Sequence, residues 1–132
     1  MREVQISKTQ KLLYPELSYK ICGLCFETQN TLGRYLTEKS YADFLEGLLK
    51  RDNIVYNREY QIPESFVGEK GRRNVADFFI DGKIIVELKS KQLISREDYF
   101  QVKRYLSATG AKLGLLVNFQ QQYLRPKRIL SS

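Results

Sequence analysis

Apolar residues recur at helical spacing in two segments near the start of the chain. After Pro15, which suits the first turn of a helix, they return every three or four positions until Gly33. Thr37 fits an N-cap, and the same spacing then continues to about Asp52. The pattern therefore predicts two consecutive helices, one ending at Gly33 and the other beginning after Thr37.

The pattern then changes to the alternation that is typical of strands. Apolar and polar residues alternate in the extended stretch 54–66, and two further strands are expected over 73–80 and 83–89. Asp81-Gly82 joins these two strands and is a strong hairpin signal. The sequence thus predicts three strands here, and the last two form a hairpin.

A third helix and a final strand complete the predicted elements. Ser95 followed by Asp98 is typical of a capping box, and helical spacing continues from there to Gly110. The continuous apolar run 112–119 predicts a strand that is covered on both faces. The element order α-α-β-β-β-α-β indicates an α/β fold, or α+β by a looser count, with helices flanking a mixed sheet.

The length of 132 residues fits one domain over residues 1–132. Residues 1–13 are poorly patterned and are expected to form a lead-in, and residues 120–132 are interpreted as a basic tail. No apolar run is long enough for a transmembrane span or a signal peptide, so we expect a cytoplasmic location and no membrane partner.

The hairpin register decides which side chains share a face of the sheet. A two-residue loop would bring a carboxylate and an ammonium group into the apolar face. A three-residue loop over 80–82, a type I turn with a left-handed glycine, instead pairs Phe79 with Lys83. The same register pairs Asp77 with Ile85, and the hydrophobic pattern alone selects it. One face is then wholly apolar (Ala76, Phe78, Ile80, Ile84, Val86 and Leu88), and the other gathers Asp77, Glu87 and Lys89.

Composition narrows the chemistry that these three residues can carry. Histidine is absent, which excludes Ser-His-Asp triads and histidine metal ligands. Cys22 and Cys25 lack the further soft ligands that a zinc site needs, so they are interpreted as core positions. Any catalysis must therefore use carboxylates, lysine, tyrosine or a metal held by oxygen.

Two carboxylates at such short range repel each other unless a cation lies between them. Lys89 can supply that charge in a purely structural ion pair. Alternatively, Asp77 and Glu87 hold a hard divalent cation, Mg²⁺ or Mn²⁺, beside Lys89. The residues alone leave both alternatives open.

The hairpin resembles the PD-(D/E)xK signature of restriction-endonuclease-like nucleases, because Asp77 is followed by nine residues and then by Glu87-Leu88-Lys89. Over roughly residues 15–120, the chain is also similar to the small GxxExxY family within that superfamily. The matching features are Leu32-Gly33, Glu38-x-x-Tyr41, ADFFIDGKIIVELKS, Gln101-x-x-x-Tyr105 and TGAKLGLLVNF. Tyr35 replaces the glycine of the family name, and Ala76 replaces the proline before the first aspartate.

The resemblance implies a restriction-endonuclease-like mixed sheet and a metal-dependent phosphodiesterase site. It implies that Asp77 and Glu87 bind the metal, helped by the Leu88 carbonyl. Glu38 would complete the site as an additional helical carboxylate, or is alternatively a solvated acid in the first turn of its helix. Lys89 would orient the attacking water and stabilise charge on the phosphorus.

The resemblance also implies contacts with nucleic acid. Gln101 and Tyr105 lie one helical turn apart and would line the site and touch DNA, or else they are a polar residue beside a core tyrosine. Tyr41 either contacts nucleic acid or only packs.

Basic residues follow the signature and suit phosphate groups, although any one of them fits a solvated face equally well. They are Lys91, Arg96, Lys103 and Arg104, with Arg125, Lys127 and Arg128 in the tail. A second patch is predicted at Lys70, Arg72 and Arg73. Lys and Arg outnumber Asp and Glu by 22 to 15, a net charge of +7, which favours a polyanionic partner but also fits a merely basic soluble protein.

The sequence therefore predicts a Mg²⁺-dependent or Mn²⁺-dependent nuclease that hydrolyses DNA with water as the nucleophile. The alternatives are a catalytically inactive nucleic-acid-binding module and an interaction subunit with a nuclease-like fold. A homodimer or larger assembly is left open.

Overall fold

The computed structural model describes residues 13–70 and 74–131. Most of the predicted lead-in, and the predicted basic positions Arg72 and Arg73, lie outside this range. The elements are α2 (Pro15–Leu32), α3 (Glu38–Arg51), β1 (Tyr56–Gln61), β2 (Val75–Ile80), β3 (Ile84–Lys89), α4 (Arg96–Thr109), β4 (Leu113–Asn118) and β5 (Lys127–Leu130). Within the described range, none of the helices has the length and apolarity that crossing a bilayer requires.

The helices begin and end where the sequence predicts. Gly33, with a positive φ of 82°, ends α2, and Thr37 accepts a hydrogen bond from the Ser40 N–H at the start of α3. Ser95 and Asp98 form the predicted capping box of α4. Local capping chemistry therefore fixes the helix boundaries.

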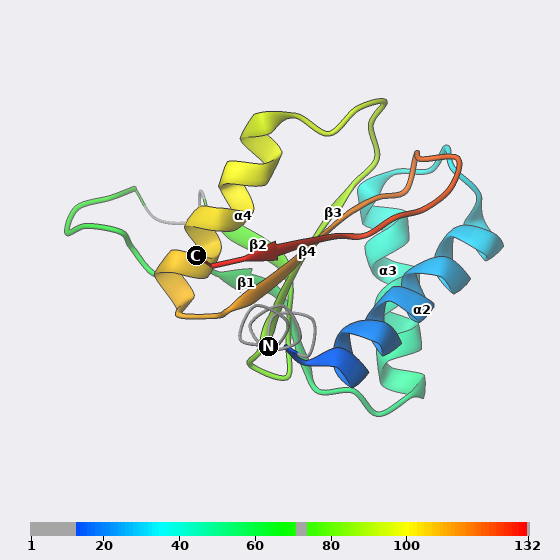
Figure 1. Ribbon diagram of the computed structural model, residues 1–132, viewed down its shortest axis with the longest axis horizontal. Helices are drawn as coiled ribbons and strands as arrows, with labels where there is room; N and C mark the ends of the chain where they lie inside the picture. Colours follow the sequence, from blue (N-terminus) through cyan, green and yellow to red (C-terminus); the bar gives the residue numbers. More distant parts are fainter. Residues whose placement is uncertain (1–12, 71–73, 132) are drawn as a thin grey trace, which may run out of the picture.

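The strands form one five-stranded sheet in the order β1-β2-β3-β4-β5. Neighbouring strands are antiparallel except β3 and β4, which are parallel because α4 crosses between them. Figure 1 shows the sheet between α4 on one side and α2 with α3 on the other. The predicted α/β fold is confirmed and is consistent with a restriction-endonuclease-like architecture.

One strand was not predicted. β5 lies in the segment interpreted as a basic tail, and it pairs antiparallel with β4 so that Ile129 lies opposite Gly114. Only Ile129 of its four residues is buried, while Lys127 and Arg128 are exposed. A four-residue edge strand with two adjacent cations has too little alternation to be recognised from the pattern.

The hairpin register differs from the prediction by two residues. Phe79 pairs with Ile85 and not with Lys83, and the turn occupies residues 81–83. Asp81 and Gly82 both have positive φ values, 53° and 61°, as a type I′ turn requires. Asp81 can adopt this conformation because aspartate tolerates the left-handed region better than most residues. The two-residue change in pairing preserves which side chains share a face, so the predicted ionisable face is retained.

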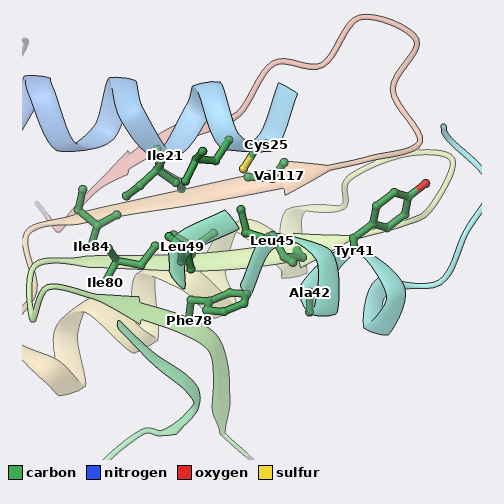
Figure 2. Packing of buried hydrophobic residues seen from close by; sticks show 14 of the residues in the cluster. Ile21, Cys25, Tyr41, Ala42, Leu45, Leu49, Phe78, Ile80, Ile84 and Val117 are labelled. Carbon is green, nitrogen blue, oxygen red and sulfur yellow. The ribbon is translucent and has the colours of Figure 1, made fainter. Parts of the chain in front are cut away.

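Two apolar clusters cover the two faces of the sheet. Figure 2 shows Leu45 and Leu49 of α3 close to Phe78 of β2, with Ile21 and Cys25 of α2 in the same cluster. All residues of the predicted apolar face lie in this cluster except Ala76, which belongs to the second cluster with α4. Cys25 lies within the first cluster, as predicted, whereas Cys22 is half-buried and packs against its edge. Burial raises the pKa of both thiols.

The second cluster fixes α4 tightly on β4. A Cβ atom added at Gly114 would lie only 2.6 Å from Val102 Cγ1 of α4. The helix can approach the strand this closely because glycine has no side chain. This contact sets the position of the α4 face that carries Gln101.

Candidate active site

The β2–β3 hairpin forks at the end away from its turn. Regular pairing continues as far as Phe78 and Val86, and the next positions are joined through side chains. The Asp77 N–H donates to Glu87 Oε1 at 2.8 Å, and the Leu88 N–H donates to Asp77 Oδ2 at 2.7 Å. The two carboxylates therefore take the place of ladder hydrogen bonds and are held side by side between the strands.

Burial makes this carboxylate pair difficult to ionise. Glu87 is 4% exposed, and burial together with the charge of Asp77 raises its pKa to about 8. Burial also raises the pKa of Asp77, and the charge of Glu38 acts in the same direction. Two buried acids of like charge disfavour joint ionisation unless a cation reaches them.

Lys89 lies on the same face, but its contacts with acids are long. Its Nζ atom is 3.9 Å from Glu87 Oε2 and 3.7 Å from Asp98 Oδ1. Its shortest polar contact is the hydrogen bond that it donates to Gln101 Oε1 at 3.3 Å. The ammonium group is therefore positioned between three groups and is not bound tightly by any one carboxylate.

Glu38 occupies the first position of α3 and is exposed. Its charge raises the pKa of both Asp77 and Glu87, so it acts on this site from the helix. Within residues 13–70 and 74–131, however, no three acidic or cysteine side chains are grouped closely enough to hold a metal ion together. The site as it stands is a pair of carboxylates with a third acid further away.

A pocket of about 330 Å³ opens beside Lys89 and is also lined by Glu97, Asp98, Gln101 and Arg104. Gln101 therefore lies beside Lys89 on the wall of this pocket, and its role in catalysis stays a prediction. The wall contains two acids and two cations, so charge within the pocket is nearly balanced.

Tyr105 lies beneath the carboxylate pair and not on the surface. It is 1% exposed, and burial raises its pKa to about 12, with the charges of Glu87 and Asp77 acting in the same direction. A side chain this deeply buried has no surface with which to contact nucleic acid directly. Its position agrees with the alternative interpretation, a core tyrosine beside the polar Gln101.

Tyr41 has a structural environment. The side chain is fully buried, and its ring stacks on Phe119 with centroids 4.3 Å apart. Its hydroxyl donates to the Gly33 carbonyl at 2.6 Å and accepts from the Leu36 N–H at 3.2 Å. These contacts favour packing, because they hold the turn between α2 and α3 in place.

The predicted phosphate-binding residues differ in their freedom to bind. Lys91 forms an ion pair, and Lys103 donates to the Leu130 carbonyl at 2.7 Å. Arg96 and Arg104 are exposed, and Arg104 borders the pocket beside Lys89. The two arginines are therefore the better placed for phosphate contacts.

The other predicted basic positions lie elsewhere on the surface. Arg125, Lys127 and Arg128 are exposed, but the Arg128 guanidinium donates to Ser18 Oγ at 2.9 Å on the α2 side. Lys70 is exposed and is the part of the second patch that lies within the described residues.

Asp98 was predicted only as a helix cap, and its second role was missed. It is 8% exposed, and its Oδ2 atom lies 2.6 Å from Lys91 Nζ. Burial opposes its ionisation, but hydrogen bonds from Lys91 and Ser95 hold its pKa at about 2. Two lysines at alternate positions, 89 and 91, followed by the capping sequence were the available signal.

Asn118 was also missed, and it fixes the backbone that follows β3. It is 2% exposed, donates to the Lys91 carbonyl at 2.8 Å and accepts from the Lys91 N–H at 3.1 Å. This pair of hydrogen bonds holds the segment after Lys89. Its signal in the sequence is only a polar residue at the end of an apolar strand.

The donor set fits a hard divalent cation. The Asp77 and Glu87 carboxylates each retain one oxygen, Oδ1 and Oε2, that is not used in the backbone bonds above. The Leu88 N–H points towards β2, and the carbonyl of a strand residue lies on the same edge as its N–H. Mg²⁺ accepts one or two carboxylates, with waters and substrate oxygens completing its shell.

The chain matches a known protein family. The family model described as the PD-(D/E)XK nuclease superfamily matches residues 15–129. Neither the comparison with curated proteins nor that with solved structures gives a match. The matched range includes the forked hairpin, α4 and most of β5.

Proposed function

Because the chain belongs to the PD-(D/E)XK nuclease superfamily, we propose that it is a metal-dependent nuclease that hydrolyses phosphodiester bonds in DNA. The observation that carries the proposal is the forked hairpin, which holds Asp77 and Glu87 together with Lys89 on the same face. We further propose that the chain is a GxxExxY-type member and that residues 1–132 form one nuclease-like domain. The cytoplasmic location stays a prediction.

Asp77 and Glu87 would hold Mg²⁺ or Mn²⁺, with the Leu88 carbonyl and with Glu38 as a more distant fourth group. When bound, the ion supplies Lewis-acid stabilisation of the charge that develops on the scissile phosphate. The protein would favour binding of that ion electrostatically, because a cation between Asp77 and Glu87 stabilises the ionised form of both acids.

Lys89 is proposed to orient the attacking water and to stabilise negative charge on the phosphorus as the bond to the leaving oxygen breaks. Gln101 accepts a hydrogen bond from its ammonium group at 3.3 Å and would therefore fix its direction. Asp98 Oδ1 lies 3.7 Å from the same ammonium group and faces it with a negative charge. Water is the nucleophile, and no covalent enzyme intermediate forms.

Arg96 and Arg104 are the proposed phosphate contacts, with Lys91 and Lys103 available if their internal bonds open. We assign no direct nucleic-acid contact to Tyr41 or Tyr105, because both side chains are buried. The net charge of +7 supports a polyanionic substrate.

The proposal is tested by nicking of supercoiled plasmid DNA with Mg²⁺ or Mn²⁺, run beside Lys89→Met, Asp77→Asn and an EDTA control. Lys50→Met is the matched control, because Lys50 is an exposed lysine on α3 without an ion pair among the described residues. We expect metal-dependent nicking by the wild type and the control only. DNA binding without turnover by all four proteins would favour the inactive binding module.

A further inference from the structure

A second groove lies between α4 and β5. Its volume is about 590 Å³, within the range of ligand sites, and Ile94, Ser95, Arg96, Tyr99, Phe100 and Lys127 contribute to its lining. Among the residues that the structure describes, no acid lines this groove, whereas the pocket beside Lys89 contains two acids. The two sites therefore suit different parts of a ligand.

Aromatic rings form one wall of the groove. Tyr99 and Phe100 are 5.4 Å apart between ring centroids and meet edge to face at 76°. The Phe100 side chain is 49% exposed, although other side chains of α4 pack against apolar neighbours. A ring left half open beside polar groups is available for stacking.

Two cations lie beside these rings. Arg96 and Lys127 are exposed, and Lys127 Nζ lies 5.1 Å from the centroid of the Tyr99 ring. Among residues 13–70 and 74–131, neither cation forms an ion pair with a carboxylate. Arg128 also borders the groove, but its guanidinium donates a hydrogen bond to Ser18 and is not counted among these cations.

We propose that this groove binds a single-stranded segment of nucleic acid, with a base stacked on Phe100 and the flanking phosphates against Arg96 and Lys127. Exposed rings beside a positively charged groove are the combination that single strands use, because every unpaired base presents a face for stacking. A duplex keeps its base faces covered and would gain only the charge contacts. An acidic peptide would use the cations but would leave the rings without a partner.

The groove is adjacent to the candidate active site. Arg96, Tyr99 and Phe100 alternate along the first turns of α4 with Glu97 and Gln101, which line the pocket beside Lys89. A nucleic-acid strand that places a phosphate in that pocket can therefore continue across the start of α4 into the groove. The inference rests on the proposed function and specifies its substrate class: nucleic acid with a single-stranded portion.

The chain has no tryptophan, so Phe100→Trp introduces a single reporter at the groove. We expect a thymidine oligonucleotide of about twelve residues to quench its fluorescence, since such lengths fit single-strand sites. Phe26→Trp is the matched control, because Phe26 is 43% exposed on α2. Its fluorescence should not change. All titrations are made in EDTA, so that no turnover is needed.

Affinity is then measured by anisotropy for the same oligonucleotide and for a duplex of equal length. Phe100→Ala should weaken single-strand binding by about tenfold, the loss expected for one stacked base, and should leave duplex binding nearly unchanged. Lys127→Ala should reduce the salt dependence of single-strand binding. Phe26→Ala and Lys50→Ala should match the wild type.

Three results would overturn the inference: equal quenching at both tryptophan positions, equal loss for single strand and duplex in Phe100→Ala, or no single-strand binding by the wild type. Mg²⁺-dependent cleavage of both the plasmid and the single-stranded oligonucleotide reports separately on the proposed function. A wild type that binds as described but never cleaves would reject the nuclease and retain the groove. If the wild type cleaves and Phe100→Ala binds single strands normally, the nuclease is retained and the groove is rejected.

Discussion

The pair of half-buried Asp77 and buried Glu87 and the single buried carboxylate of Asp98 both lie near Lys89, yet their pKa values move in opposite directions. Burial raises both pKa values of the pair, helped by the charge of Asp77 at Glu87 and by the charge of Glu38 at Asp77. Hydrogen bonds from Lys91 and Ser95 instead overcome burial and lower the pKa of Asp98. The two sites differ in how close a cation lies. Lys91 Nζ is 2.6 Å from Asp98 Oδ2, whereas Lys89 Nζ is 3.9 Å from Glu87 Oε2.

This difference separates an acid that is neutralised within the protein from a pair that is not, and it supports the proposed role of the pair in chemistry. Asp98 is satisfied within the protein and closes the start of α4. Among the described residues, the pair accepts hydrogen bonds from backbone N–H groups, and its nearest cation is the distant ammonium group of Lys89. Ionisable groups with strongly shifted pKa values are candidates for a functional site.

The largest expected effect is on catalysis by Lys89. Lys89→Met should reduce plasmid nicking about 10²–10³-fold, the range found when one group that stabilises the transition state is removed. Single-turnover nicking rates at saturating Mg²⁺ measure this, with circular dichroism to verify folding. Nicking that survives in Lys89→Met would mean that the lysine serves only as an ion-pair partner.

Stability should respond in opposite directions to neutralising the two kinds of acid. In EDTA, at a pH above the folded-state pKa of Glu87, Glu87→Gln should raise the free energy of unfolding by about 1–3 kcal/mol, because it removes a buried unpaired charge. Asp98→Asn should lower it by about 1–3 kcal/mol, because it breaks charged hydrogen bonds. Urea unfolding measures both, and changes of the same sign would remove the distinction.

The pH dependence of stability should sharpen the same comparison. The folded-state pKa of Glu87, about 8, is above its ordinary value of 4.5, so the folded state binds more protons between these values. The free energy of unfolding of the metal-free wild type should therefore fall as pH rises through this window and level off above it. The stability that Asp98 contributes is present above its ordinary pKa of 3.8 and is lost as pH falls towards about 2.

Urea midpoints in EDTA across this range, for the wild type and Glu87→Gln, isolate the contribution of the pair. The variant should show a flatter profile between the two pKa values. Identical profiles would mean that Glu87 is ionised in the folded protein throughout.

The smallest expected effect is on the direction of the lysine. Gln101→Leu removes one hydrogen bond to Lys89, so the nicking rate should fall about 2–10-fold with little change in DNA affinity. Gln120→Leu, a partly exposed glutamine at the end of β4, is the matched control. A loss of affinity with an unchanged rate would place Gln101 in substrate binding and not in positioning.

Periodicity and capping predicted most of the fold, because helix ends and strand faces are local properties. Gly33, Thr37, Ser95 and Gly110 each mark a boundary that the structure retains. The pairing of the hairpin was wrong, although its faces were right, because two registers that differ by two residues bury the same side chains. β5 was missed, because its burial depends on a distant neighbour, β4.

The candidate site could be predicted only in part. The D…ExK spacing located Asp77, Glu87 and Lys89, but burial of Tyr41 and Tyr105 depends on tertiary packing that no motif encodes. Asp98 escaped because one residue serves both as a helix cap and as an ion-pair partner. Motifs thus identify residue types, and packing decides which of them face the substrate.

Calorimetric titration of Mn²⁺ into the metal-free protein tests most directly the central claim that Asp77 and Glu87 need an external cation. At neutral pH the account predicts one ion bound per chain with release of protons, because Glu87 is largely protonated before binding. Binding should be lost in Glu87→Gln and retained in Asp98→Asn. Mn²⁺ binding that survives Glu87→Gln, or that disappears only in Asp98→Asn, would contradict the account.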